Sequence, residues 1–353
     1  MRPSDERGLT ASDLWSYLLG RPWTSSWGQW RHNIQRMNGQ ASSSSRTNWL
    51  LFLLLGCLWG SSFLFIKVGV EAGLHPFTLV ALRLLFGTIL LAVVVVVTRE
   101  RLPRERRIYG HMLVVSVISM ALPFVLITWA EQRVDSALAA ALDAAVPIVV
   151  IPLAAVLLPD EPFSRSRLAG VGVGFIGVML LVGFNPGTAS RGDLVGGLAV
   201  VAATISYACG AVYARRNLRD VRPTIPAAFQ VGFAFIIVAV LALLFEHPLD
   251  FTAPRDALVS VLWLGLLGTG VAYLVFFRLL ASWGATRASL VAYLLPVVGV
   301  TLGVLVLHEQ VDGRFLAGTA MVVGGIALVN LRSGARVTLR RSRSAVVDCP
   351  EPA

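Results

Sequence analysis

The arginine residues of this chain are divided unevenly between the gaps that separate its apolar runs. The even-numbered gaps carry nearly all of the arginine, whereas the odd-numbered gaps carry almost none. Each run is close to the ~20 residues that a helix needs to cross about 30 Å of hydrocarbon. Inside a bilayer the backbone has no water to bond to, so such runs must be helical. The pattern predicts an all-α integral membrane protein with ten transmembrane helices, near residues 49–70, 76–97, 109–129, 135–158, 167–184, 193–214, 225–245, 257–280, 284–307 and 314–331.

Composition excludes a soluble globular protein. Hydrophobic residues make up 56% of the chain and charged residues 14%, which leaves too little polar side chain to cover a water-exposed surface. The net charge of +10 is accounted for by the arginine-rich gaps, so no nucleic-acid partner is expected. The expected surroundings are the lipid bilayer.

Loop charge predicts which way the protein faces, because Lys and Arg are enriched on the cytoplasmic side of membrane spans. One side collects the arginines before the first run, in the even-numbered gaps and after the last run. The other side holds only Arg133, Arg191, Arg255 and Arg314. Both termini are therefore expected in the cytoplasm. Arginine outnumbers lysine by 29 to 1, which is typical of GC-rich bacterial genomes and favours the inner (plasma) membrane of a bacterium.

Polar segments flank the membrane region. Residues 1–48 are predicted to be a disordered cytoplasmic extension, and residues 332–353 a basic cytoplasmic tail. The extension holds four tryptophans among arginine and serine, so an anchor on the membrane surface is one alternative. Translation from Met37 is another. No cleavable signal peptide is visible, so the first span is expected to act as its own insertion signal.

A pattern in the first half of the chain recurs 148 residues later. It consists of Glu161, Leu168, Ala169, Gly170 and Gly177, which return as Glu309, Leu316, Ala317, Gly318 and Gly325. The same shift pairs Trp59 with Tyr207 and Lys67 with Arg215, and a one-residue slip pairs Pro147 with Pro296. Residues 49–184 and 192–331 are therefore predicted to be two five-helix repeats. Because five is odd, the second copy is inverted in the membrane, as in many secondary transporters whose substrate site lies near the midplane.

The order and spacing of these residues resemble the EamA-type members of the drug/metabolite transporter superfamily, over roughly residues 49–331. The residues that carry the resemblance are Trp59, Gly60, Ser61, Ser62, Lys67, Pro76, Arg83, Pro147, Glu161 and Gly170, then Tyr207, Pro296, Glu309 and Gly318 in the second copy. The resemblance implies ten spans in two repeats and export or exchange of small metabolites such as amino acids, amines and drugs, with no ATPase subunit. It does not imply one substrate. The alternative is a translocator of nucleotide sugars or lipid-linked carriers with the same fold.

Arg83 and Asp143 are charged residues inside predicted spans, where a charge is unfavourable and needs a reason. At 1.5 Å per residue, Arg83 lies ~10 Å and Asp143 ~12 Å below the outer surface. We expect both to face the central cavity and either to pair with each other or to bind the charged ends of a zwitterionic substrate. A purely structural ion pair between the second and fourth spans is the alternative. A protonatable Asp143 would further couple transport to the proton gradient.

Four aromatic residues are predicted to line the cavity, because aromatic walls suit apolar or cationic solutes. They are Trp59, Tyr207, Tyr273 and Tyr293, and ordinary helix packing is their alternative.

Two further pairs are candidates for hinge or gate residues. Pro147 and Pro296 would kink their helices and act as pivots, with a static kink as the alternative. Lys67 and Glu131 lie near the outer ends of their spans. Lys67 is long enough to snorkel to the headgroups instead, and Glu131 suits an interfacial position.

No metal-ligand, nucleotide-loop or hydrolase motif is present, so neither a cofactor nor a metal is expected and the chain is not predicted to be an enzyme. The run from Gly170 to Gly177 lies within an apolar span and favours close helix packing, within a monomer or between two copies in a homodimer. The leading hypothesis is a secondary transporter that exports small metabolites by alternating access, with protons as candidate coupling ions.

Overall fold

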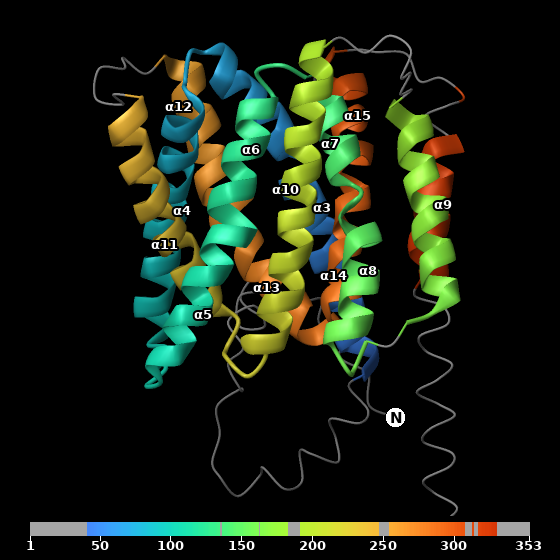
Figure 1. Cartoon of the computed structure of the whole chain (residues 1–353), viewed down its shortest axis with the longest axis horizontal. Coiled ribbons are helices and arrows are strands. Elements are labelled where there is room, and N and C mark those ends of the chain that lie inside the picture. Colours follow the sequence, from blue (N-terminus) through green and yellow to red (C-terminus); the bar gives the residue numbers. More distant parts are fainter. Residues whose placement is uncertain are drawn as a thin grey trace, which may run out of the picture.

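The computed structural model describes residues 41–134, 136–161, 163–182, 191–246, 254–307, 313 and 317–329. All regular structure in these ranges is helical, and the helices form one upright bundle (Figure 1). Seven helices there are long and apolar enough to cross a membrane: Arg46–Glu71, Pro76–Thr98, Arg106–Ala130, Leu138–Leu157, Leu194–Asn217, Thr224–Phe245 and Arg255–Trp283. The prediction of a multi-span, all-helical membrane protein is confirmed. The predicted extension up to residue 40, Glu309 and the predicted basic tail lie outside the described residues.

The first half of the chain contains the helices α3 (Ala41–Glu71), α4 (Pro76–Thr98), α5 (Arg106–Ser116), η1 (Val117–Ala121), α6 (Leu122–Ala130), α7 (Ser136–Asp143), α8 (Val146–Leu157) and α9 (Arg165–Val182). Helix α3 begins at Ala41 rather than at residue 49, so residues 41–48 are helical where the sequence predicted a disordered extension. Thr47 and Asn48 are already buried against the bundle, and this packing stabilises the helix below its apolar run.

The second half contains α10 (Arg191–Asn217), α11 (Thr224–Phe245), α12 (Arg255–Leu262), η4 (Trp263–Val271), α13 (Ala272–Trp283), α14 (Ala285–Ser289), η5 (Leu290–Tyr293) and α15 (Leu294–Leu307). A further apolar helix covers Ala317–Val329. Gly284 joins α13 to α14 with φ at +82°, a conformation that side chains with a Cβ rarely adopt.

Two spans contain a stretch of wider, π-helical turns, η1 between α5 and α6 and η4 between α12 and α13. Such turns leave carbonyl groups without their usual helical partner and are frequent at functional sites. In η1 these carbonyls are used by other helices. The Ser206 hydroxyl donates to the Ile118 carbonyl at 2.6 Å, and the Tyr273 hydroxyl donates to the Ser119 carbonyl at 3.2 Å.

Two other helical segments are interrupted part-way along. A turn at residues 144–145 separates α7 from α8, and the 3-10 turn η5 separates α14 from α15. Pro147 lies in the first turn of α8 and Pro296 in the first turn of α15, where the missing N–H of a proline does least harm. Both predicted pivots therefore follow directly on an interruption of their helix.

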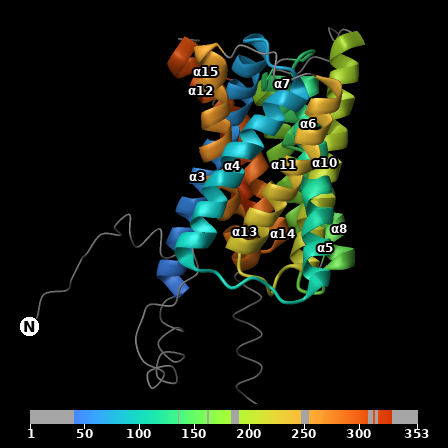
Figure 2. The same ribbon diagram turned by 90° about the vertical axis from the view of Figure 1, so that its left-hand side faces the viewer.

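Helices α4 and α11 lie side by side and run in opposite directions (Figures 1 and 2). At one end, the Glu246 carboxylate accepts hydrogen bonds from the backbone N–H of Phe77 at 3.0 Å and of Thr78 at 2.7 Å. These groups belong to the first turn of α4, whose N–H groups have no partner in their own helix. At the other end, Arg222 forms an ion pair with the buried Glu100 at 2.9 Å. The second half of the chain thus holds both ends of α4.

Helix α9 crosses the helix 317–329 in very close contact. A Cβ atom added to Gly170 would lie 2.9 Å from the Gly325 carbonyl oxygen, and one added to Gly177 would lie 2.8 Å from the Gly318 carbonyl oxygen. Because higher numbers in one helix meet lower numbers in the other, the two helices are antiparallel. The predicted close packing of the glycine-rich span therefore occurs within one chain.

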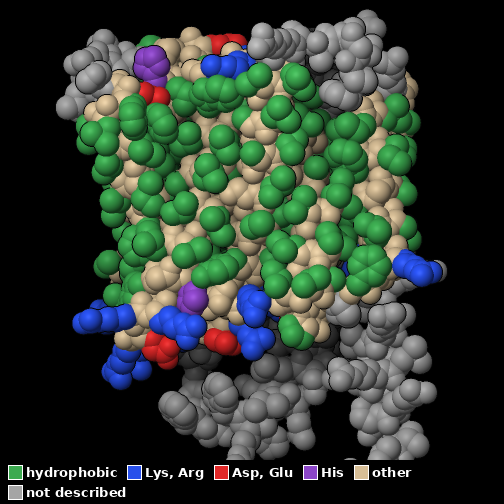
Figure 3. Space-filling view, viewed as in Figure 1, with side chains coloured by type: hydrophobic (Ala, Val, Ile, Leu, Met, Phe, Trp, Pro, Cys, Tyr) green, Lys and Arg blue, Asp and Glu red, His purple; other side chains and the backbone are tan. Residues whose placement is uncertain are grey.

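The outer surface of the bundle is apolar. Figure 3 shows a broad hydrophobic belt with Lys and Arg gathered mainly at the lower rim of this face, where α5 begins and α10 ends. Large apolar side chains are exposed on the outside of the molecule, among them Val96, Val156 and Leu244. Such a surface is stable in lipid and not in water.

Candidate functional site

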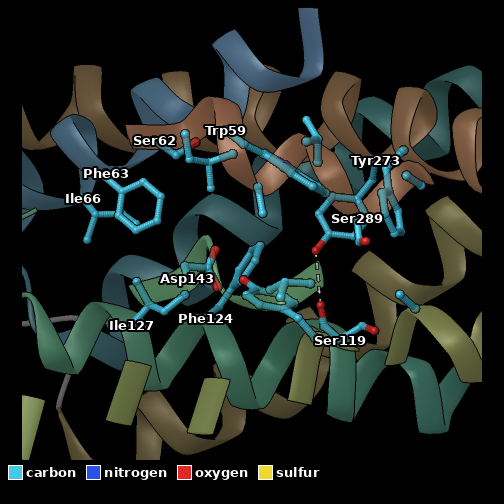
Figure 4. Close-up of a pocket in the computed structure, with 18 of the residues that line it drawn as sticks. Trp59, Ser62, Phe63, Ile66, Ser119, Phe124, Ile127, Asp143, Tyr273 and Ser289 are labelled. Atoms are coloured by element: carbon cyan, nitrogen blue, oxygen red, sulfur yellow. Dashed lines mark hydrogen bonds between the residues drawn. The ribbon is translucent and has the colours of Figure 1, made fainter. Parts of the chain in front are cut away.

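A cavity lies in the middle of the bundle and provides about 850 Å³ of space free of protein atoms, part of it open to solvent. Its walls come from α3, α4, η1, α6, α7, α8, α10, α13, α14, η5 and α15. Most of the lining is apolar, and the exceptions in it are Arg83, Asp143, Tyr207, Tyr273, Ser62, Ser119 and Ser289. Figure 4 labels five of these, namely Asp143, Tyr273, Ser62, Ser119 and Ser289. The π-helical stretch η1, the turn between α7 and α8, and the 3-10 turn η5 all adjoin this cavity. Five of the six predicted cavity residues, Trp59, Arg83, Asp143, Tyr207 and Tyr273, lie in its wall.

Arg83 projects from α4 and is 3% exposed. Its Nε donates to the Thr269 hydroxyl at 3.3 Å, and the guanidinium carbon lies 4.0 Å from the centre of the Phe124 ring. Cation–π contact of this kind stabilises a charge away from water. The hydrogen bond uses one of the five N–H donors of arginine. In the described part of the chain no carboxylate pairs with Arg83, so the remaining donors are free to bind an anion in the cavity.

Asp143 is the last residue of α7 and is 6% exposed. One carboxylate oxygen accepts a hydrogen bond from the Thr204 hydroxyl at 3.4 Å, and that hydroxyl is shared with the Val200 carbonyl at 2.9 Å. Among the described residues no Lys, Arg or His forms an ion pair with it. The direct pair with Arg83, one alternative from the sequence, is therefore wrong for this structure. The two side chains sit on different helices with separate partners, and each is held by a threonine hydroxyl rather than by the other.

Aromatic rings form one continuous wall of the cavity. Trp59 lies 5.7 Å from Tyr273 and 5.4 Å from Phe276 between ring centres, and Phe124 lies 6.4 Å from Tyr207 and 6.3 Å from Tyr273. These separations are those at which aromatic pairs attract one another. The wall can therefore pack against a flat or apolar group of a substrate.

Tyr293 lies away from this wall, contrary to the prediction. It is fully buried, and its hydroxyl donates to the Val171 carbonyl on α9 at 2.7 Å. Its neighbours Val291 and Ala292 on η5 line the cavity in its place. Tyr293 thus joins η5 to α9 and holds the broken span against its neighbour.

Lys67 and Glu131 meet at one end of the cavity, and Glu131 lies one helical turn beyond the lining residue Ile127. The Lys67 ammonium donates to the Glu131 backbone carbonyl at 3.3 Å. The Glu131 side chain is fully buried rather than interfacial, and it accepts a hydrogen bond from the Ser136 hydroxyl at 2.9 Å. Burial raises the pKa of the Glu131 carboxyl above its ordinary value. These contacts join α3, the end of α6 and the start of α7.

The raised pKa of Glu131 predicts a pH-dependent effect on stability. Between the ordinary and the raised pKa, the folded protein keeps a proton that the unfolded chain releases, so stability falls as pH rises. We expect Glu131→Gln to raise the melting temperature of the detergent-solubilised protein by about 2 °C or more at pH 9 and to change it little at pH 5. Scanning fluorimetry at both pH values measures this. Equal shifts at pH 5 and pH 9 would mean that the carboxyl is not held neutral.

Several residues of the site were not predicted, namely Phe124, Phe276, Thr204, Thr269, Ser119 and Ser289. For Phe124 the sequence held a signal. The slip that relates Pro147 to Pro296 also relates Phe124 to Tyr273. The serines and threonines have no charge and fall in no periodic pattern, so the sequence does not distinguish them from serines and threonines elsewhere in the chain.

Comparison with known proteins follows the same division of the chain. The model of the EamA-like transporter family matches twice, at residues 47–183 and 194–331. The chain is 25% identical to the uncharacterized transporter YoaV of Bacillus subtilis strain 168, over 76% of this chain and 91% of that protein. It is 26% identical to a probable amino-acid metabolite efflux pump of Salmonella typhimurium strain LT2, over 80% and 94%. It is 25% identical to the uncharacterized inner membrane transporter YedA of Escherichia coli strain K12, over 78% and 87%.

A solved structure has the same fold. It is described only as a crystal structure of a protein, and it superposes with a TM-score of 0.66 at 21% identity. The superposition covers 80% of this chain and 96% of that one. At this identity the likeness shows the fold alone.

Proposed function

This chain belongs to the EamA-like transporter family and is a multi-pass transporter of the inner membrane, and we propose that it exports a small zwitterion of the amino-acid type by alternating access. The observation that carries the proposal is the pair of buried, opposite charges in the cavity wall, Arg83 and Asp143, neither of which forms an ion pair with another described residue. A ligand with one anionic and one cationic group can neutralise both charges at once.

In this proposal Arg83 binds the substrate carboxylate. The planar guanidinium offers parallel N–H donors that match the two oxygens of a carboxylate. Asp143 accepts hydrogen bonds from the substrate ammonium, and the aromatic wall around Tyr273 packs against its side chain. The match to a probable amino-acid metabolite efflux pump supports this substrate class.

Alternating access follows from two halves that exchange conformations, and several observations support inverted repeats. The two family matches divide the chain into two copies. The π-helical stretch η1, moved by 148 residues, falls within η4, and the turn between α7 and α8 falls within η5. The corresponding helices α4 and α11 are antiparallel, as are α9 and the helix 317–329. Ten spans with both termini in the cytoplasm fit this arrangement and the arginine-rich lower rim in Figure 3.

Asp143 is also the proposed coupling residue. A carboxylate buried in a span without a basic partner is stable when it carries a proton or a bound cation. A proton and the substrate ammonium would compete for the same carboxylate oxygens of Asp143. Asp143 would therefore bind the proton in one state and the ammonium in the other. Inward movement of a proton could then drive outward movement of the zwitterion.

The cavity chemistry disfavours a translocator of nucleotide sugars or lipid-linked carriers. Such a substrate carries net negative phosphate charge and no ammonium to offset it, whereas the cavity wall offers one cation, Arg83, and one anion, Asp143. The anion would repel the phosphates.

Three matched solutes test the proposal in proteoliposomes: an aromatic amino acid, the amine that lacks its carboxylate and the acid that lacks its ammonium. We expect counterflow of the amino acid to exceed that of both analogues, and an imposed proton gradient to drive its accumulation. Arg83→Gln should lower kcat/KM for the amino acid by about 30-fold or more and leave the amine nearly unchanged, because a charged hydrogen-bond partner is lost for one solute only. Preferred transport of a nucleotide sugar, or an equal loss for amino acid and amine, would contradict the proposal.

A further inference from the structure

Gln230 is a buried amide of α11 that has no hydrogen-bond partner among the described residues. Its side chain is 1% exposed, and neither the amide oxygen nor the amide nitrogen is bonded there. A buried polar group without partners is destabilising, and an apolar side chain of similar size would avoid this. Gln230 also does not line the cavity in this structure. Packing therefore gives no reason for a glutamine at this position.

The repeat gives Gln230 a counterpart in the cavity. The two family matches begin at residues 47 and 194, and this shift of 147 residues, one less than the shift of the sequence repeat, carries Arg83 onto Gln230. The depths mirror each other as well. Arg83 lies about 10 Å from the start of α4, and Gln230 about 9 Å from the start of α11, at the opposite face.

The neighbours of the two residues correspond in the same way. Helix α4 packs on the π-helical stretch η4, from which Thr269 binds Arg83. Helix α11 packs on η1, the π-helical stretch at the corresponding position of the first half. In the proposed topology, Gln230 therefore has the position in the cytoplasmic part of the bundle that Arg83 has in the outer part.

We propose that Gln230 binds the substrate when the cavity opens to the cytoplasm, as the counterpart of Arg83. The inference rests on the proposed alternating access, in which each half adopts the conformation that the other has now. A glutamine amide donates to a carboxylate and accepts from an ammonium, yet carries no charge. A zwitterion is thus oriented on the cytoplasmic side without the strong charge pairing that Arg83 supplies on the outer side.

The first test is the sidedness of substrate affinity. In sealed vesicles of each orientation, Gln230→Leu should raise KM from the cytoplasmic face about tenfold, the effect of one lost hydrogen bond. KM from the outer face should stay within about twofold, and the amount of folded protein should not fall. A variant with unchanged KM at both faces and a higher melting temperature would overturn the proposal, because Gln230 would then be an idle buried amide.

The second test does not depend on the solute. In a background without Cys57, Cys209 and Cys349, a charged, membrane-impermeant thiol reagent added from the cytoplasmic side should modify Gln230→Cys. The matched control on the same helix, Ile236→Cys, faces lipid and should stay unmodified. Inert Gln230→Cys in an actively transporting protein would contradict the inference. If wild-type protein moves no zwitterion but Gln230→Cys reacts, the proposed substrate is wrong and the position of Gln230 stands.

Discussion

Asp143→Asn is expected to lower kcat/KM for a zwitterion by about 30-fold or more and to abolish stimulation by a proton gradient. The variant keeps the shape of the side chain but removes the charge that binds the ammonium and the site that takes a proton. Membrane insertion and the amount of folded protein should not change. The measurement is initial uptake in proteoliposomes, with and without the gradient, at equal amounts of monodisperse protein.

The matched control for this variant is Asp160→Asn. Asp160 is half-exposed and pairs with Arg215 at 2.9 Å near the end of α10, away from the cavity. Surface pairs of this kind contribute little, so transport should stay within about twofold. A structural role for Asp143 makes a different forecast. Asp143→Asn would then lower the yield of folded protein.

Gly325→Leu is expected to prevent the chain from folding to a stable, monodisperse protein. A Cβ atom at this position would lie 2.5 Å from the Gly170 carbonyl oxygen and 2.7 Å from the Gly174 backbone nitrogen. Both are backbone atoms, so α9 and the helix 317–329 would have to move apart, which costs several times the ~1–3 kcal/mol of ordinary overpacking. Size-exclusion chromatography of detergent-extracted protein measures the outcome.

Gly324→Leu is the control for this crossing. A Cβ atom at Gly324 meets nothing within 4 Å, and the residue differs from Gly325 only in the face of the helix that it occupies. We expect Gly324→Leu to elute like the wild type. Equal behaviour of the two variants would mean that the crossing is not tightly packed.

The elements that follow from chain-wide patterns could be predicted from the sequence. The all-helical membrane fold was predicted from the apolar runs and from the division of arginine between the gaps. Both patterns recur at every predicted span. Glu161 and Gly170 recur in the second half of the chain, and the family model matches each half once, in agreement with this repeat. For the site, depth and repeat position selected Trp59, Arg83 and Tyr207, and the cavity wall includes all three.

What could not be predicted depends on contacts between helices. Tyr293 was assigned to the cavity as if its span were one regular helix. Tyr293 is the last residue of the 3-10 turn η5, which has three residues per turn instead of 3.6. Its side chain is therefore rotated from the position that a regular helix would give it, and it points to α9. Similar depths for Arg83 and Asp143 suggested a pair, yet depth says nothing about position around the bundle. Thr204 and Thr269, which share hydrogen bonds with Asp143 and Arg83, are ordinary residues in the sequence.

The hydrogen bonds of Glu246 to the start of α4 have a consequence for synthesis of the chain. Thr78 leaves the ribosome 168 residues before Glu246, an interval of about 10–30 s at ordinary rates of translation. Until then, water or lipid headgroups must serve the first N–H groups of α4. The Glu161 carboxylate likewise lacks its donors, the backbone N–H groups of Ala285 and Thr286, until those residues have been synthesised. A ribosome that stops between the halves therefore releases a product in which the start of α4 lacks the carboxylate of Glu246 and the carboxylate of Glu161 lacks its two N–H donors.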